Sequence, residues 1–245
     1  MASGNELNVS FLITWKKVLS SKINFFFFFG FLLLLGYIWQ KDSFASSFKF
    51  FLLLFPYLFL LLSQDMIKDE LESGCLENVL FLEGKFKSYL LRKNLFLSFI
   101  ACLCVFTIFC VFSICGIISG EFSSLYIYQF SIGILVGLYY ISLGGLLSFY
   151  FKGGSNVLIV ILGQLLMFIG MLFYAAQNSR FVEYLDRGVF PDALSQLKLM
   201  AFIIVFPNIV ISKKFFVYSV EIALLGVLAI GLQKIKTKRL ELSQK

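Results

Sequence analysis

Long runs of apolar residues, separated by short polar stretches, make up most of this chain. A run of about 20 apolar residues is long enough to cross the hydrocarbon core of a bilayer as a helix. The pattern predicts six transmembrane helices, over the ranges 23–39, 48–62, 95–118, 125–151, 156–176 and 215–232. A membrane helix tolerates the internal Pro56 because neighbouring groups can satisfy the freed carbonyl. We expect an all-α membrane protein with one transmembrane domain over residues 1–245.

Two further stretches have patterns that differ from a span. In residues 7–22, apolar residues recur at three- and four-residue spacing beside Trp15 and lysines, which is typical of an interfacial helix on the membrane surface. A simple juxtamembrane tail is the alternative. The apolar part of residues 190–212 is too short to cross and is broken by Pro207 and Asn208. It predicts a re-entrant segment or interfacial helix pair rather than a seventh span.

The composition supports this class. The chain is 60% hydrophobic and 14% charged, whereas soluble domains carry about 25% charged residues, so the bilayer is the solvent for much of it. It has no His, which excludes mechanisms that need an imidazole base or ligand. Of the five Cys, four fall in the third predicted span, where we expect small packing residues rather than metal ligands or disulfides. No metal site is expected.

The net charge of +7 favours an orientation in the membrane rather than nucleic-acid binding. The basic residues are scattered at the ends of apolar runs and do not form one face, and such residues beside membrane helices stay in the cytoplasm. With six spans, most of the 21 Lys and Arg residues fall on the side of the two termini, 64–94 and 152–155. We expect a multi-pass protein of the cell inner membrane with both termini cytoplasmic.

The longest charged interruption, residues 64–94, follows the second predicted span. Within it, over about 66–83, apolar residues share one face at helical spacing while the acids face elsewhere; these residues are Leu71, Cys75, Leu76, Val79 and Leu80. The spacing predicts an amphipathic helix on the cytoplasmic surface. A solvated charged loop is the alternative.

This stretch resembles the permease subunits of ABC transporters of the type-2 exporter class. Their usual motif is E-x-E-x-G-T-L-E-x-L-L after the second span. Here Glu70 and Glu72 match the paired acids, the sequence Gly-Cys-Leu-Glu at 74–77 matches G-T-L-E, and Val-Leu follows. Cys75 replaces the Thr, and the Pro that the family has soon afterwards is absent near Gly84. The layout of interfacial helix, six spans and re-entrant segment is also similar.

The resemblance implies that the helix at 66–83 is a coupling helix, which inserts into a cleft of a separate ATPase subunit. It assigns this contact to Glu70, Glu72, Gly74, Cys75, Leu76 and Glu77. The chain lacks the phosphate-binding pattern G-x-x-x-x-G-K-[ST], so ATP and Mg²⁺ are expected on the ATPase subunits and no cofactor or catalytic residue here. A second permease subunit, identical or related, is the other expected partner.

A few polar residues lie inside the predicted spans. The candidates for a transport path are Glu221, Gln164, Asn156 and Thr107. An intramembrane carboxylate is a functional hypothesis, although Glu221 at the outer interface could pair with Lys49 or Lys213. The other three either line a path or join helices by hydrogen bonds, and we favour the second interpretation.

Two pairs of glycines have the spacing that lets membrane helices approach closely. They are Gly133 with Gly137 and Gly116 with Gly120. The adjacent Gly144–Gly145 pair either loosens the fourth predicted span or lets a neighbouring helix pack. Because this spacing is common by chance, each match alone is weak.

Together these features predict the permease subunit of an ATP-driven exporter. Its cargo would be a peptide, a drug-like molecule or a lipid-linked amphipathic molecule that leaves the cytoplasm or the inner leaflet. The first alternative, a secondary transporter driven by an ion gradient, needs buried ionisable residues near mid-membrane, and the chain offers few. A non-transporting membrane scaffold or assembly factor is the other alternative. An intramembrane enzyme is disfavoured because no span carries paired acids.

Overall fold

The computed structural model describes residues 22–63, 86–151, 155–177, 192–212 and 216–243. Most of these residues are in helices joined by short turns, and no strand occurs among them. The helices are α2 Lys22–Lys41, α3 Phe44–Leu54, α4 Pro56–Leu62, α7 Phe86–Ser119, α8 Leu125–Leu147, α9 Ser155–Gln177, α11 Ala193–Val205, the 3-10 helix η1 Pro207–Ser212, and α12 Phe216–Ser243. The expected interfacial helix before Lys22 and the expected helix at 66–83 lie outside the described residues.

Four of the described ranges are long and apolar enough to cross a membrane. They are Phe44–Leu62, formed by α3 and α4 together, Tyr89–Ser119 in α7, Leu125–Leu147, and Ser155–Gln177. Phe28–Lys41 and Gln196–Val205 are shorter apolar helices. The described part of the chain is therefore helical and suited to a membrane. Helix α7 begins before the expected boundary at 95 and α12 continues past 232, because the polar residues at these span ends prolong the helix without breaking it.

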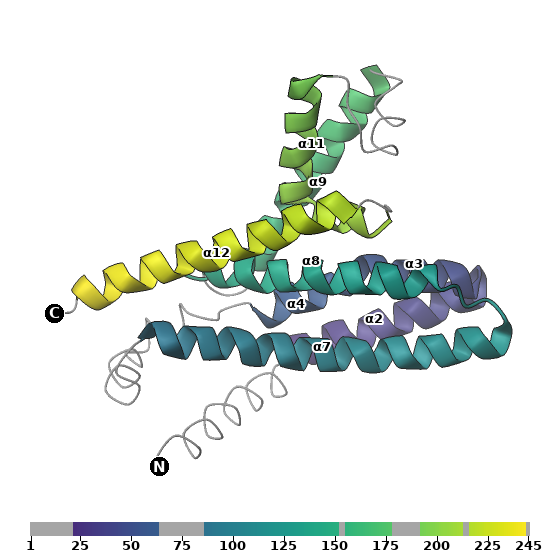
Figure 1. Ribbon diagram of the computed structural model, residues 1–245. Coiled ribbons are helices and arrows are strands. Elements are labelled where there is room, and N and C mark those ends of the chain that lie inside the picture. Colours follow the sequence, from purple (N-terminus) through teal and green to yellow (C-terminus); the bar gives the residue numbers. More distant parts are fainter. Residues whose placement is uncertain (1–21, 64–85, 152–154, 178–191, 213–215, 244–245) are drawn as a thin grey trace, which may run out of the picture.

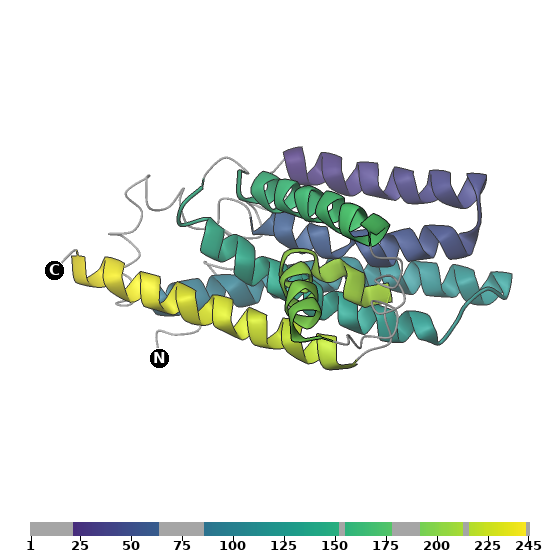
Figure 2. The ribbon, with the colours of Figure 1, turned by 90° about the horizontal axis from the view of Figure 1, so that it is seen from above.

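Six of the helices run side by side, and a hairpin projects from them. Helices α2, α3, α4, α7, α8 and α12 share one long direction in both views (Figures 1 and 2). The α2–α3 and α7–α8 turns lie at one end of this group, whereas α4, α8 and α12 end, and α7 begins, toward the other. Helix α9 projects from the group at an angle, and α11 runs back toward the group in a direction crosswise to α8 and α12 (Figure 1).

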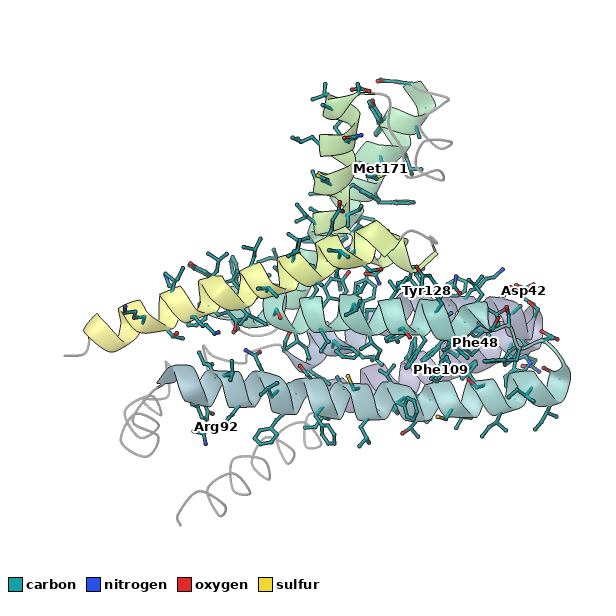
Figure 3. All side chains as sticks on the ribbon, viewed as in Figure 1. Asp42, Phe48, Arg92, Phe109, Tyr128 and Met171 are labelled. Atoms are coloured by element: carbon teal, nitrogen blue, oxygen red, sulfur yellow. The ribbon has the colours of Figure 1, made fainter. Side chains whose placement is uncertain are left out.

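The core of the group is built from phenylalanines of the α3–α4 range. Phe48, Phe51, Phe55 and Phe59 recur at helical spacing and are all 0% exposed. The ring of Phe51 stacks on Phe112 of α7, with the two centroids 5.5 Å apart. Figure 3 labels Phe48 and Phe109, whose side chains meet between α3 and α7 with ring centroids 5.8 Å apart. These contacts pack α3 against α7, and α8 contacts both α7 and the α3–α4 range in the same core.

Helix α3 is separated from α4 by Pro56, which has no N–H to donate to a carbonyl one turn back. The Leu58 N–H instead donates to the Phe55 carbonyl at 3.0 Å, so the hydrogen bonding tightens locally to a three-residue spacing. The chain continues in the same general direction through α4 (Figure 1). Carbonyls beside this break consequently need donors from other parts of the protein.

The glycines of α8 accommodate side chains of the α3–α4 range. A Cβ added at Gly137 would lie 2.7 Å from Cγ of Phe59, and a Cβ added at Gly133 would lie still closer to the ring of Phe55. Farther along α8, Gly144 lies against the Ser63 hydroxyl. The prediction that the Gly133–Gly137 spacing permits close helix contact is confirmed.

Candidate functional site

The expected ATPase-coupling residues between 70 and 77 lie outside the described residues, so their structure and role stay a prediction. The described helices show where the segment that contains the coupling residues joins the helix group. Helix α4 is followed by the buried Ser63, and α7 begins at Phe86. The end of α4 and the beginning of α7 both lie toward the end of the group where α12 finishes (Figure 1).

A chain of hydrogen bonds links five elements around the proline break. The Tyr57 hydroxyl donates to Oε1 of Gln164 at 2.5 Å, and Nε2 of Gln164 donates to the Tyr140 hydroxyl at 2.7 Å. The Tyr140 hydroxyl donates in turn to Oδ1 of Asn208. Nδ2 of Asn208 donates to the Leu53 carbonyl at 2.6 Å. The chain thus runs from α4 through α9, α8 and η1 to α3.

Burial explains why these polar groups are paired so completely. Tyr140 and Asn208 are 0% exposed and Gln164 is 4% exposed. A buried polar group without a partner costs free energy, and a bilayer offers no water as a substitute. The Tyr57 and Tyr140 rings also stack, with centroids 5.5 Å apart. This hydrogen-bonded cluster holds α9 and η1 against the broken helix.

Asn156 makes a second attachment of α9, two turns before Gln164. Its Nδ2 lies 3.4 Å from the Gly144 carbonyl and 3.5 Å from the Ser63 carbonyl, and its Oδ1 accepts from the Val157 N–H. Asn156 and Gln164 therefore share the face of α9 that packs on α4 and α8. These contacts favour the helix-joining interpretation of both residues, and a role in a transport path stays a prediction.

Thr107 and Glu221 have different surroundings. Thr107 is exposed on α7, and its hydroxyl donates to the Leu103 carbonyl of the same helix at 2.9 Å. Glu221 is partly exposed near the beginning of α12, and no ion pair of its carboxylate is found among the described residues. Lys49 is exposed and Lys213 lies outside the described residues. The four candidates for a transport path are therefore not gathered at one place.

The sequence reasoning did not single out another polar cluster, which joins α7, α8 and α12. Nδ2 of Asn94 donates to Oε1 of Gln233 at 3.0 Å, and Nε2 of Gln233 donates to the Ser142 carbonyl at 2.5 Å. Asn94 and Gln233 stand at the boundaries of expected spans, where a polar residue is unremarkable. Tyr57 and Tyr140 could have been identified by a different signal, because a tyrosine hydroxyl inside a span needs a partner.

The comparisons with known proteins give no further guidance. Comparison of the chain with models of protein families, with curated proteins and with solved structures finds no match. The functional interpretation therefore rests on the residues of this chain and on the contacts described above.

Proposed function

We propose that this chain is the membrane-spanning permease subunit of an ATP-driven exporter of the ABC type-2 class. The observation that carries the proposal is the motif at 70–77, which follows the second span directly. In this proposal α2, the α3–α4 range, α7, α8, α9 and α12 are the six spans, and α11 with η1 is the re-entrant segment. Two such subunits, identical or related, pair in the inner membrane and bind two cytoplasmic ATPase subunits.

The contacts at both ends of the coupling segment support this proposal. On one side, Ser63 lies against Gly144, and its carbonyl lies near Nδ2 of Asn156, so α4 is attached to α8 and α9. On the other side, Asn94 near the beginning of α7 is bonded to Gln233 of α12. A displacement of the coupling helix by ATP-driven closure would reach α8, α9 and α12 through these contacts.

The proposed cargo is a peptide, a drug-like molecule or a lipid-linked amphipathic molecule, moved out of the cytoplasm or the inner leaflet. Both termini are cytoplasmic in this proposal. A secondary transporter is less well supported, because the buried polar side chains in the described part of the span helices are hydroxyls and amides, with Lys93 the only charged one. The scaffold alternative makes no use of the motif at 70–77.

Affinity purification of the tagged chain from its own cells tests the proposal. An ATP-binding subunit should copurify, and the double reversal Glu72→Lys with Glu77→Lys should reduce its recovery, because it inverts the acidic surface offered to the ATPase. The matched control reverses Asp42 and Glu121, which are exposed in the turns at the opposite end of the helix group. Failure to recover any ATPase with the unaltered chain, or equal loss in both double variants, would refute the proposal.

A further inference from the structure

A shallow groove separates the beginning of α7 from the final turns of α12. It holds a cavity of about 20 Å³, which is room for roughly one water molecule. The lining comprises Leu90, Leu91 and Asn94 of α7 with Ile230, Gln233, Lys234 and Thr237 of α12. Oδ1 of Asn94 is buried and accepts no hydrogen bond from the described residues. One of the lining residues thus carries a buried acceptor without a donor among the described residues.

The face of α12 beside this groove changes from apolar to cationic along its length. Val227 is 66% exposed, and a Cβ at Gly231 would meet nothing within 4 Å, so this part of the face is open. Lys234 and Lys238 follow at the spacing that keeps them on the same face, and both are exposed. Two like charges one turn apart repel each other and favour a bound anion between them.

Helix α7 presents exposed apolar side chains beside the same groove. Leu95 is 61% exposed and Leu91 is 43% exposed, and large exposed apolar side chains recur from Leu91 to the end of the helix. An exposed apolar stripe that ends beside lysines marks the boundary between the hydrocarbon and the headgroups. The groove therefore lies where the phosphate of a membrane lipid lies.

We propose that one anionic glycerophospholipid binds over this groove. Its phosphate lies between Lys234 and Lys238, and its acyl chains lie along Val227 and Gly231 of α12 and against Leu95 of α7. A soluble anion would satisfy the lysines but would leave the apolar part of the groove uncovered.

The test uses the full-length chain in detergent after removal of native lipid. Its thermal unfolding midpoint is followed while short-chain phosphatidylglycerol, short-chain phosphatidylcholine or glycerol 3-phosphate is added. Phosphatidylglycerol should raise the midpoint at lower concentration than phosphatidylcholine, and glycerol 3-phosphate should leave it unchanged. Each of Lys234→Gln and Lys238→Gln should raise the phosphatidylglycerol concentration needed for the same shift of the midpoint roughly fivefold, because a lysine near a lipid surface contributes about that factor to the affinity.

Two controls separate a built site from general attraction of charge. The variant that carries Lys41→Gln and Lys49→Gln removes two exposed lysines toward the other end of the helix group and should respond like the unaltered chain. The variant that carries Lys234→Arg and Lys238→Arg should keep the response. Equal responses to the two lipids, a full response to glycerol 3-phosphate, or equal losses in both Gln variants would overturn the proposal. These outcomes do not depend on whether an ATPase binds.

Discussion

The close approach of α3–α4 to α8 yields a direct stability prediction for Gly137→Ala. The added Cβ would lie 2.7 Å from both Cγ and Cδ2 of Phe59, well inside ordinary van der Waals contact. Phe59 is 0% exposed and its ring centroid lies 6.4 Å from that of Phe55, so the ring has little room to withdraw. The backbones of the two helices must therefore separate.

Two opposing free-energy terms set the size of the effect. Alanine in place of glycine in a helix is favourable by about 0.5–1 kcal/mol, whereas overpacking a buried site costs about 1–3 kcal/mol. We expect Gly137→Ala to lower the free energy of unfolding by about 1–2 kcal/mol. The control is Gly163→Ala in α9, where an added Cβ meets nothing within 4 Å. This variant should gain only the favourable helix-propensity contribution.

Reversible unfolding in mixed micelles measures both variants. The sharper assay adds Phe59→Leu, which shortens the ring side chain that meets the new methyl group. In the double-mutant cycle the combined variant should lose about 1 kcal/mol less than the sum of the single losses. Equal stability of the variants at 137 and 163, or simple additivity of the changes at 137 and 59, would contradict the packing described here.

Two further substitutions test other contacts. Asn208→Leu leaves a backbone carbonyl without its donor and the Tyr140 hydroxyl without its acceptor, so the free energy of unfolding should fall by about 2–4 kcal/mol. Thr107→Val on the exposed face of α7 should change it by less than about 0.5 kcal/mol. Comparable losses in both variants would show that the buried cluster carries no special stability. Lys198→Met removes the ammonium group 4.5 Å from the centroid of the Tyr174 ring. The lost cation–π attraction of about 0.5–1 kcal/mol should appear as faster amide hydrogen exchange in α11. Unchanged exchange in α11 would count against this contact.

Sequence reasoning identified the class and several local features because these depend on composition and spacing alone. Apolar runs of sufficient length require helices in a membrane, since each backbone polar group must be paired within its own segment. The Gly133–Gly137 spacing predicted a close helix contact, and Phe55 and Phe59 provide it. The number of spans, the orientation and the coupling residues at 70–77 remain predictions.

The tertiary structure decided which apolar and polar faces are buried. In a bilayer, lipid and protein interior are equally apolar, so hydrophobicity does not distinguish the buried Phe51 from the exposed Phe50. Likewise, Gln164 is buried in a hydrogen-bonded cluster whereas Thr107 faces outward, although both are polar residues within apolar runs. The partners of Gln164 come from α4 and α8, which are remote in sequence, so only the packing of the helices brings these groups together.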